Sequence, residues 1–127
     1  MKVKVSELPP SKLQSVDPDA TLADVAKLMH TSNSDSVAVM TKGDLVGIIT
    51  ERDLVQAIAE GVDPNDAKAH AVMSSDPVTV SEDEDVAVVA MKMMRRGVRH
   101  LPVVNRSGAP TGLVSASDLI PVLEREG

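Results

Sequence analysis

Apolar residues follow a helical period in "TLADVAKLM", near the start of the 127-residue chain. Leu22, Val25 and Met29 recur every three or four residues, which is the spacing of one face of an amphipathic helix. Thr21 precedes the first of them and Asp24 follows three residues later, which is the signature of a capping box. The pattern therefore predicts a helix that begins directly after Thr21.

The pattern then changes to short apolar runs that are typical of β-strands. "SVAVM" and "LVGIIT" flank a Lys-Gly-Asp turn, and this arrangement predicts a β-hairpin. A second helix is predicted from Thr50 to a stop at Gly61, and "LQSV" near residue 15 indicates a short leading strand. Together these elements form a β-α-β-β-α unit.

The same unit recurs in the second half of the chain. "VAVVAMKMM" behind Asp85 repeats the first helix, "LPVV" and "TGLVS" repeat the hairpin, "VTV" repeats the leading strand, and another helix follows Ser115. The shift that places Val16 on Val80 also places Val39 on Val103, and it grows by one position after the longer second hairpin turn. Self-similarity at a fixed offset indicates a duplicated structural unit.

The duplication predicts the domain organisation and the fold class. We expect repeats at residues 3–61 and 66–126, joined by the polar stretch "EGVDPNDAK", which together form one module. One unit cannot cover both faces of its small sheet, whereas two units can. We therefore predict an α/β (α+β) fold in which the repeats pack through their sheets, with pseudo-two-fold symmetry and a cleft between them.

Composition excludes several classes of function. The chain has no Phe, Tyr or Trp, so bases cannot be stacked on aromatic rings, and it has no Cys, so disulfides and thiolate sites are absent. Its net charge of −6 argues against nucleic-acid binding, and "RRGVRH" is too short to change this. The sequence shows no signal-peptide core and no apolar run of about 18 residues. We expect a cytoplasmic protein that binds neither nucleic acid nor membrane.

Two strings of the form Gly-apolar-apolar-hydroxyl-x-x-Asp, "GIITERD" and "GLVSASD", offer specific chemistry. Each is most simply a capping box, in which Thr50 or Ser115 caps a helix and Asp53 or Asp118 reaches back. A hydroxyl beside the unpaired N–H groups of a helix N-terminus also suits a phosphate or ribose oxygen. A carboxylate one turn later can accept both hydroxyls of a ribose, and the two roles are compatible.

With these strings, "VDPDATLADVAKLM", "VSEDEDVAVVAMKMM" and "RHLPVVNRSG", nearly the whole chain resembles a tandem pair of cystathionine-β-synthase (CBS) domains. The resemblance implies a sensor of adenosine ligands bound between the repeats. Site A would combine residues from both repeats: Thr50, Arg52, Asp53, Val78, Thr79, Arg99, His100, Leu101 and Pro102. Site B would be its counterpart: Gln14, Ser15, Asp35, Ser36, Val37, Ser115, Ser117 and Asp118.

The repeats depart from the family pattern in two places. Pro102 keeps an apolar-Pro pair in the second repeat, whereas Ala38 stands at that position in the first, so the strand geometry at site B can differ. Pro121 falls inside the last predicted helix, where it removes a backbone donor and is expected to bend the helix.

Other candidate residues have simpler interpretations beside functional ones. Met91, Met93 and Met94 fit gap-filling in a core without aromatic rings, or a subunit interface. "SEDED" fits a solvated acidic run at a helix start rather than a metal site. His30 and His70 are expected at the surface, while His100 beside Arg99 could serve either as a ligand contact or as a bystander.

The sequence therefore predicts a regulatory module with no catalysis of its own, because no nucleophile with a positioned base is apparent. AMP, ADP or ATP is the expected ligand, with Mg²⁺ as an optional companion and no required cofactor. A homodimer acting on an unidentified protein target is expected. The alternatives are a dimerisation adaptor without ligand, a sensor of S-adenosylmethionine or NADH, and an accessory fragment of an enzyme such as inosine-monophosphate dehydrogenase.

Overall fold

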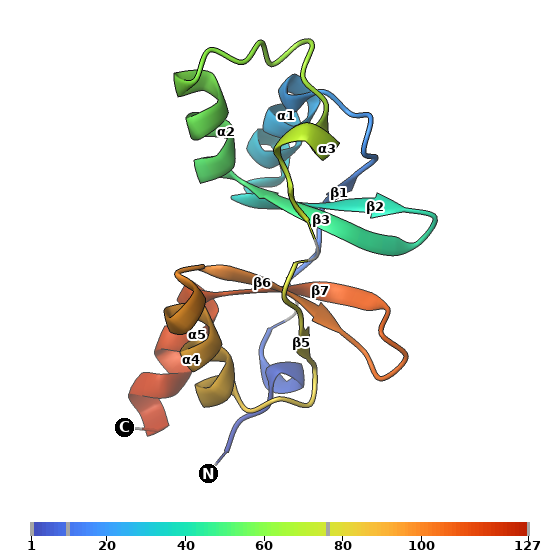
Figure 1. Cartoon of the computed structure of the whole chain (residues 1–127). Coiled ribbons are helices and arrows are strands. Elements are labelled where there is room, and N and C mark those ends of the chain that lie inside the picture. The colour runs from blue at the N-terminus through green and yellow to red at the C-terminus, as the bar shows by residue number, and fades with distance from the viewer. Residues whose placement is uncertain (1, 10, 76, 127) are drawn as a thin grey trace. The chain divides into compact units, whose positions relative to one another are not determined.

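The computed structural model describes residues 2–9, 11–75 and 77–126, with only the backbone of Glu126. The chain divides into two compact units. The first unit comprises Gln14–Pro77, and the second comprises the N-terminal residues up to Leu13 together with the chain from Val78 onward. Within each unit, helices lie against one face of a small sheet (Figure 1). The mixed α+β class with two sheets is confirmed.

The first unit contains the helices and strands of the first predicted β-α-β-β-α unit and two further short elements. Its sheet has the order β1-β2-β3-β4, with β1 and β2 parallel and the other neighbours antiparallel. In chain order the elements are β1 (Ser15–Val16), α1 (Leu22–Ser32), β2 (Ser36–Thr41), β3 (Asp44–Thr50), α2 (Glu51–Ala59), α3 (Ala69–Val72) and β4 (Ser74–Ser75).

The second unit repeats this order around a three-stranded sheet, β5-β6-β7. The strand β5 is parallel to β6, and β6 is antiparallel to β7. In chain order the elements are the 3-10 helix η1 (Val5–Glu7), β5 (Val80–Ser81), α4 (Val86–Arg96), β6 (His100–Val104), β7 (Pro110–Ser115) and α5 (Ala116–Glu126).

The helix starts follow the capping residues that the sequence predicts. The Asp24 amide donates to Thr21 Oγ1 at 3.1 Å and the Thr21 amide donates to Asp24 Oδ2 at 3.4 Å, so the predicted capping box of α1 is confirmed. Asp85 caps α4 by accepting the Ala87 amide at 2.8 Å. These bonds satisfy backbone donors that the first helical turn leaves without partners.

The two hairpins share one irregularity despite their different turns. In the first hairpin Lys42 and Gly43 have φ values of 51° and 84°, the left-handed conformation that a two-residue turn between twisted strands requires. The register shifts once in β2, directly after Val39, and once in β6, directly after Val103. Because Val39 and Val103 correspond under the repeat offset, the bulge is part of the duplicated frame.

The first residues of each repeat pack in the unit that the rest of the other repeat forms. The Val5 amide donates to Glu84 O at 2.9 Å, and the Ala69 amide donates to Ala20 O at 2.8 Å. Under the repeat offset, Val5 corresponds to Ala69 and Ala20 corresponds to Glu84. Both Val5 and Ala69 are buried. The compact units therefore differ from the sequence repeats: residues 3–13 pack with the second unit and residues 67–75 with the first.

Each unit has its own aliphatic core. In the first unit Val25, Met29, Val37, Val39, Ile49 and Ala69 form the buried cluster. In the second unit the buried cluster is Val5, Val80, Val86, Val89, Met93, Leu101, Val103, Val114, Leu119 and Val122. Pro121 lies inside α5 as predicted, and the helix continues past it to Glu126.

The three predicted methionines divide between core and surface. Met93 is 4% exposed and fills the second core, whereas Met91 and Met94 are 49% and 81% exposed. Gap-filling therefore explains Met93 alone. Among the described residues, no helix combines the length and the apolar character that a membrane span requires.

Candidate ligand-binding site

The first candidate feature is the junction of β3 and α2, where the strand ends at Thr50 and the helix begins. The Thr50 amide donates to Asp53 Oδ2 at 2.8 Å, and the Thr50 hydroxyl donates to the same oxygen at 3.1 Å. The Asp53 amide donates in return to Thr50 Oγ1 at 3.3 Å, which completes a capping box. Within the described chain, every recorded hydrogen bond of this carboxylate uses Oδ2. The oxygen Oδ1 is therefore available to a ligand.

The junction of β7 and α5 repeats this arrangement. The Ser115 amide donates to Asp118 Oδ2 at 2.9 Å, and the Ser115 hydroxyl donates to that oxygen at 3.1 Å. Ser115 Oγ also lies 2.8 Å from Ser117 Oγ. Both predicted motifs thus hold a half-buried carboxylate in the same pose at a helix N-terminus. This pose suits the hydroxyl groups of a ribose, and the helix N-terminus suits an anion.

One backbone contact brings a further predicted residue to each junction. The Glu51 amide donates to Asp35 O at 3.0 Å in the first unit, and the Ala116 amide donates to Arg99 O at 2.9 Å in the second. Asp35 and Arg99 occupy equivalent positions under the repeat offset. The same frame therefore carries a negative side chain at one junction and a positive side chain at the other.

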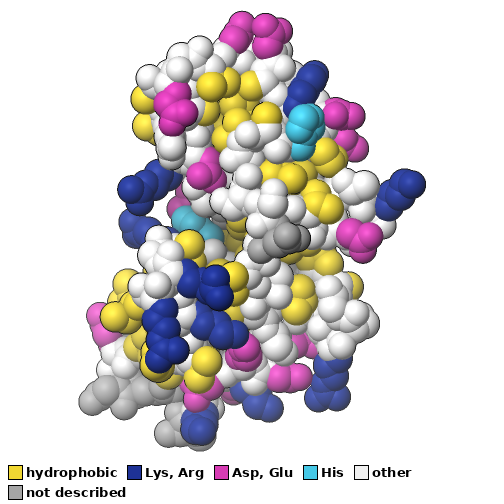
Figure 2. Space-filling view, in the orientation of Figure 1, with side chains coloured by type: hydrophobic (Ala, Val, Ile, Leu, Met, Phe, Trp, Pro, Cys, Tyr) yellow, Lys and Arg dark blue, Asp and Glu magenta, His cyan; other side chains and the backbone are white. Residues whose placement is uncertain are grey.

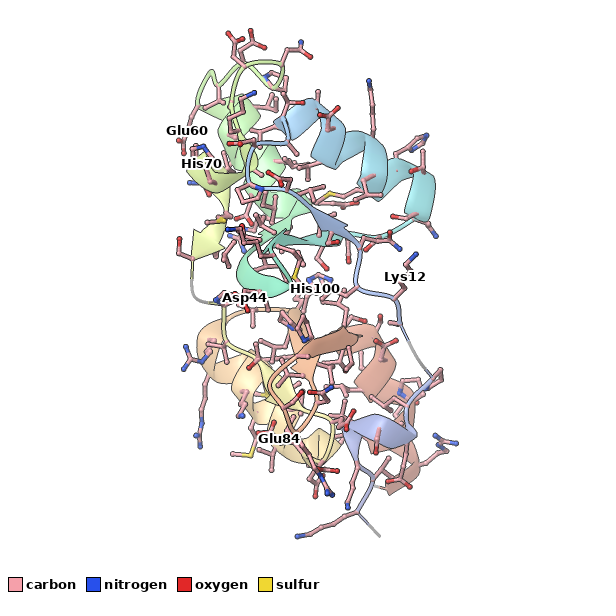
Figure 3. The ribbon with its side chains drawn as sticks, turned by 90° about the vertical axis from the view of Figure 1, so that its right-hand side faces the viewer. Lys12, Asp44, Glu60, His70, Glu84 and His100 are labelled. Atoms are coloured by element: carbon pink, nitrogen blue, oxygen red, sulfur yellow. The ribbon has the colours of Figure 1, made fainter. Side chains whose placement is uncertain are left out.

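The strand that follows this residue supplies the next predicted contacts. Ser36 is opposite Thr50 in the β2–β3 register, and His100 is opposite Ser115 in the β6–β7 register. Val37, Leu101 and Pro102 are buried in these strands. His100 is half-buried and is labelled on β6 in Figure 3.

Ser36 stands out because its hydroxyl is buried without a partner. The side chain has no solvent exposure, and Oγ makes no hydrogen bond to any other described residue. An unpaired buried hydroxyl costs on the order of 1–3 kcal/mol, so a polar ligand atom at this position would stabilise it.

The residues that lead into the first strand of each sheet complete the predicted sets. Gln14 O accepts the Ala38 amide at 2.7 Å, which anchors the start of β1, and Ser15 belongs to β1 itself. Val78 and Thr79 precede β5 and are half-buried.

The structure therefore groups the predicted residues by unit. Thr50, Arg52 and Asp53, assigned to site A, lie in the first unit with the site B residues Gln14, Ser15, Asp35, Ser36 and Val37. The second unit holds the site A residues Val78, Thr79, Arg99, His100, Leu101 and Pro102 with the site B residues Ser115, Ser117 and Asp118. The assignment of these halves to two composite sites remains a prediction.

The sequence predicts close approach of another group to Gly47 and Gly112, and the structure confirms it, but the sequence interpretation did not identify the approaching segments. A Cβ on Gly47 would lie 2.8 Å from Met73 Cγ, whereas a Cβ on Gly112 would lie 2.9 Å from the Ser11 backbone oxygen. Pro9 is the counterpart of Met73 under the repeat offset. The repeat offset also aligns residues 3–13 with residues 67–77, since Lys4 falls on Lys68 and Val5 on Ala69. This alignment is the sequence signal that both segments belong to the duplicated unit.

The second unit contains a groove along this segment. The groove has a volume of about 140 Å³. It is lined by Val5, Ser6, Leu8, Pro9, Ser11, Glu82, Val103, Thr111, Gly112, Leu113, Val114 and Asp118. The lining thus includes residues of β7 and Asp118 of the second motif.

The acidic run "SEDED" has structural partners. Glu84 Oε1 accepts the Lys92 ammonium at 2.7 Å, Asp83 Oδ2 accepts Arg106 Nε at 3.2 Å, and Asp85 caps α4. No group of three or more potential metal ligands occurs among the described residues. His30 and His70 are exposed as predicted, and Figure 3 labels His70. His70 Nε2 lies 4.0 Å from Asp19 Oδ1.

Known proteins resemble the chain over almost its full length. An uncharacterized 17.7 kDa protein of Acidianus ambivalens is 36% identical over 97% of this chain and 74% of that protein. Similar proteins of Methanocaldococcus jannaschii and Methanopyrus kandleri are 35% and 33% identical. The chain spans 44% and 62% of their respective lengths.

Solved structures show the same fold. A CBS domain protein from Pyrobaculum aerophilum complexed with AMP is 30% identical, with a TM-score of 0.88, and the match covers 96% of this chain and 97% of that one. A CBS domain pair in complex with 5′-methylthioadenosine and S-adenosyl-L-methionine is 25% identical, with a TM-score of 0.87 and full coverage of both chains.

The two capped junctions, the repeated bulge and the repeated strand order show that the chain contains a duplicated unit. A family model matches the two halves separately. The model is that of the CBS domain, and it matches residues 5–60 and again residues 69–125. The protein belongs to the CBS domain family and is a tandem pair of CBS domains.

Proposed function

We propose that this protein is a non-catalytic regulatory module that binds an adenosine-containing ligand, with AMP, ADP or ATP as the preferred class. The duplicated carboxylate pose is the observation that carries the proposal. Oδ2 of Asp53 and Oδ2 of Asp118 each accept a backbone amide and a hydroxyl. These bonds fix the orientation of each carboxylate and leave its Oδ1 for a ligand. A preorganised acceptor of this kind favours a ribose diol.

The similar solved structures support an adenosine ligand. The Pyrobaculum protein was solved with AMP, and the second domain pair was solved with 5′-methylthioadenosine and S-adenosyl-L-methionine. These ligands share adenosine and differ in what the ribose carries at its 5′ position. The 5′ group is therefore the part on which the residues of this chain must discriminate.

Charge around the motifs favours a phosphate at site A. Site A would combine Arg52 from the first unit with Arg99 and His100 from the second. An arginine can bind phosphate oxygens through two parallel hydrogen bonds. Site B would offer Ser117 and the negatively charged Asp35 at the equivalent positions, so we expect it to bind phosphates less well.

Site B suits a second ligand class for the same reason. A nucleoside whose 5′ group is a thioether or a sulfonium carries no phosphate that Asp35 would repel. Ser36 Oγ, which has no partner among the described residues, would donate or accept a hydrogen bond there. S-adenosylmethionine and related thioethers are therefore the second candidates at site B.

The proposal includes no catalytic step and no resident cofactor. At each junction the carboxylate oxygen that accepts the hydroxyl also accepts a backbone amide, so it acts as a helix cap rather than as a free base. Mg²⁺ would enter only as a companion of a bound nucleoside triphosphate. The module would act in the cytoplasm as a homodimer, on a protein target that its own chain does not include.

Isothermal titration of ligand-free protein tests the proposal. AMP, ADP, ATP, S-adenosylmethionine and NADH are titrated separately, and we expect heat from at least one adenine nucleotide. Saturation at a hundredfold excess over Kd should stabilise the fold by about 2.7 kcal/mol, visible as a raised Tm. Heat from none of the five ligands would favour a dimerisation adaptor instead.

A further inference from the structure

The groove in the second unit reaches the aliphatic core of that unit. Val5, Val103 and Val114 line the groove and also belong to the buried cluster. The volume of the groove is about 140 Å³. A cavity of about 150 Å³ with aliphatic walls holds one benzene-sized molecule. The groove can therefore take a small apolar group and remove it from water.

The first unit shows which side chain fits the equivalent space. Met73 lies over Gly47 and packs against the first core, whose members include Val39 and Ile49. A methionine side chain is unbranched and flexible, and its thioether is polarisable, so it fills irregular apolar space. In this unit the chain itself supplies the occupant.

The second unit repeats this frame without that side chain. Under the repeat offset, Pro9 stands at the position of Met73, and Val103 and Val114 stand at the positions of the two first-core residues. All three line the groove. A proline ring is shorter than a methionine side chain and reaches less far over the core. A short unbranched chain from outside would take the place that Met73 holds in the first unit.

The charged side chains at the groove are acidic. Among the described lining residues they are Glu82 and Asp118. Asp118 Oδ2 caps α5, whereas the half-buried side chain of Glu82 has no recorded hydrogen bond or ion pair within the described chain. Figure 2 shows acidic as well as apolar side chains at the surface of this unit. The groove therefore favours a cationic ligand over an anionic one.

Backbone hydrogen bonds hold Glu82 beside the segment that covers the groove. The Glu82 amide donates to Val104 O at 3.1 Å, and Glu82 O accepts the Ser6 amide at 2.9 Å. The position of this carboxylate is thus fixed by the N-terminal segment and by β6 together, while its side chain is left for a ligand.

We propose that the groove is a further ligand site, which binds a small amine through a short aliphatic or thioether chain. The chain would lie against Val103 and Val114, and the ammonium group would pair with Glu82. The site uses residues of the second unit alone. It therefore goes beyond the adenosine sites of the proposed function and does not depend on them.

NMR of the valine and isoleucine methyl groups, with methylthiopropylamine as the probe, tests the proposal. This molecule joins a methionine-like chain to an ammonium group. We expect saturable shifts at Val103 and Val114 and little change at Val39 and Ile49, where Met73 fills the equivalent space. Methylthiopropionate, with a carboxylate on a similar chain, should bind about tenfold more weakly or worse, because like charges repel. No saturable shift at the two valines, or equal binding of both probes, would overturn the proposal.

Filling the groove from within provides a second readout. Pro9→Met gives the second unit the side chain that the first unit has at this position, and it should abolish the shifts. Pro9→Ala removes the same ring without filling the groove, so it is the matched control and should keep them. Binding that survives in Pro9→Met, or that is lost equally in Pro9→Ala, would overturn the proposed occupancy.

The role of the carboxylate is tested by Glu82→Gln, which should weaken binding of methylthiopropylamine by about fivefold. Glu124→Gln removes the same charge at an exposed position on α5 outside the groove, and it should leave binding unchanged. An affinity unaltered by Glu82→Gln would overturn the pairing. Titration of AMP into each variant reports separately on the adenosine sites, since none of these changes replaces a residue assigned to them.

Discussion

The two capped junctions differ in charge while their backbones agree. In the first unit the residue that accepts the amide at the helix start is Asp35, and in the second it is Arg99. Within the motif, Arg52 of the first unit corresponds to Ser117 of the second. Asp35 and Arg99 support the helix starts through their backbone oxygens, so their side chains can differ in charge while the frame is kept.

The two segments that pack in the opposite unit, residues 3–13 and 67–75, also share a backbone arrangement and differ in their side chains. Equivalent hydrogen bonds from backbone amides hold both segments. The first unit places Met73 over Gly47, whereas the second unit has Pro9 at the position equivalent to Met73. The two copies share the hydrogen bonds and differ in the packing.

Val5→Asp should destabilise the second unit most. Val5 is 6% exposed in an aliphatic core, and an unpaired buried carboxylate there should cost about 3 kcal/mol or more. Ala69→Asp should act similarly in the first unit. Urea denaturation measures the loss, and Ser6→Asp at an exposed neighbouring position is the control. Equal small effects of Val5→Asp and Ser6→Asp would show that the segment does not belong to the core.

Gly47→Ala should cost about 1–3 kcal/mol because its Cβ would displace Met73. Met73→Ala in the same chain should relieve part of this loss, a coupling that a double-mutant cycle measures. Gly112→Ala should not be relieved by Pro9→Ala, since the obstructing atom is the Ser11 backbone oxygen. Additive effects of Gly47→Ala and Met73→Ala would refute the proposed difference between the units.

Arg52→Ser should give the first motif the residue of the second and weaken tight AMP binding by about tenfold, because a charge-assisted hydrogen bond contributes roughly 1.5–3 kcal/mol. Adenosine should bind with little change, since it lacks the phosphate. Calorimetry with both ligands makes the comparison. Equal losses for AMP and adenosine would mean that Arg52 acts on the fold or on the nucleoside.

The smallest expected effect concerns the caps of α1 and α4. Thr21→Ala and Asp85→Ala each remove a side-chain acceptor at a helix start, and each should cost about 1 kcal/mol. Thermal denaturation can resolve this loss. A cost well above the usual range of about 0.5–2 kcal/mol for either variant would indicate a role beyond capping.

Much of this frame could be predicted from the sequence, because its signals are local. The Thr21 capping box, the Lys42–Gly43 turn and the helix after Thr50 depend on neighbouring residues, and the structure confirms them. The repeat offset also predicted which residues of the two sheets correspond, since Val16 pairs with Val39 as Val80 pairs with Val103.

The packing of residues 3–13 and 67–75 in the opposite unit could not be predicted from local signals. Residues 3–13 and 67–77 carry weak periodicity, and their partners lie far away along the chain, as with Val5 and Glu84. The interpretation of the methionines was incomplete for a similar reason. Helical spacing alone does not tell that Met93 faces a core while Met94 faces solvent.

Calorimetric titration of AMP into Asp53→Ala and Asp118→Ala tests the central claim that one frame carries two unequal nucleotide sites. We predict that Asp53→Ala weakens the tight binding event tenfold or more, that Arg99→Ala does the same, and that Asp118→Ala leaves it nearly intact. Loss of tight binding in Asp118→Ala, with Asp53→Ala harmless, would contradict the account.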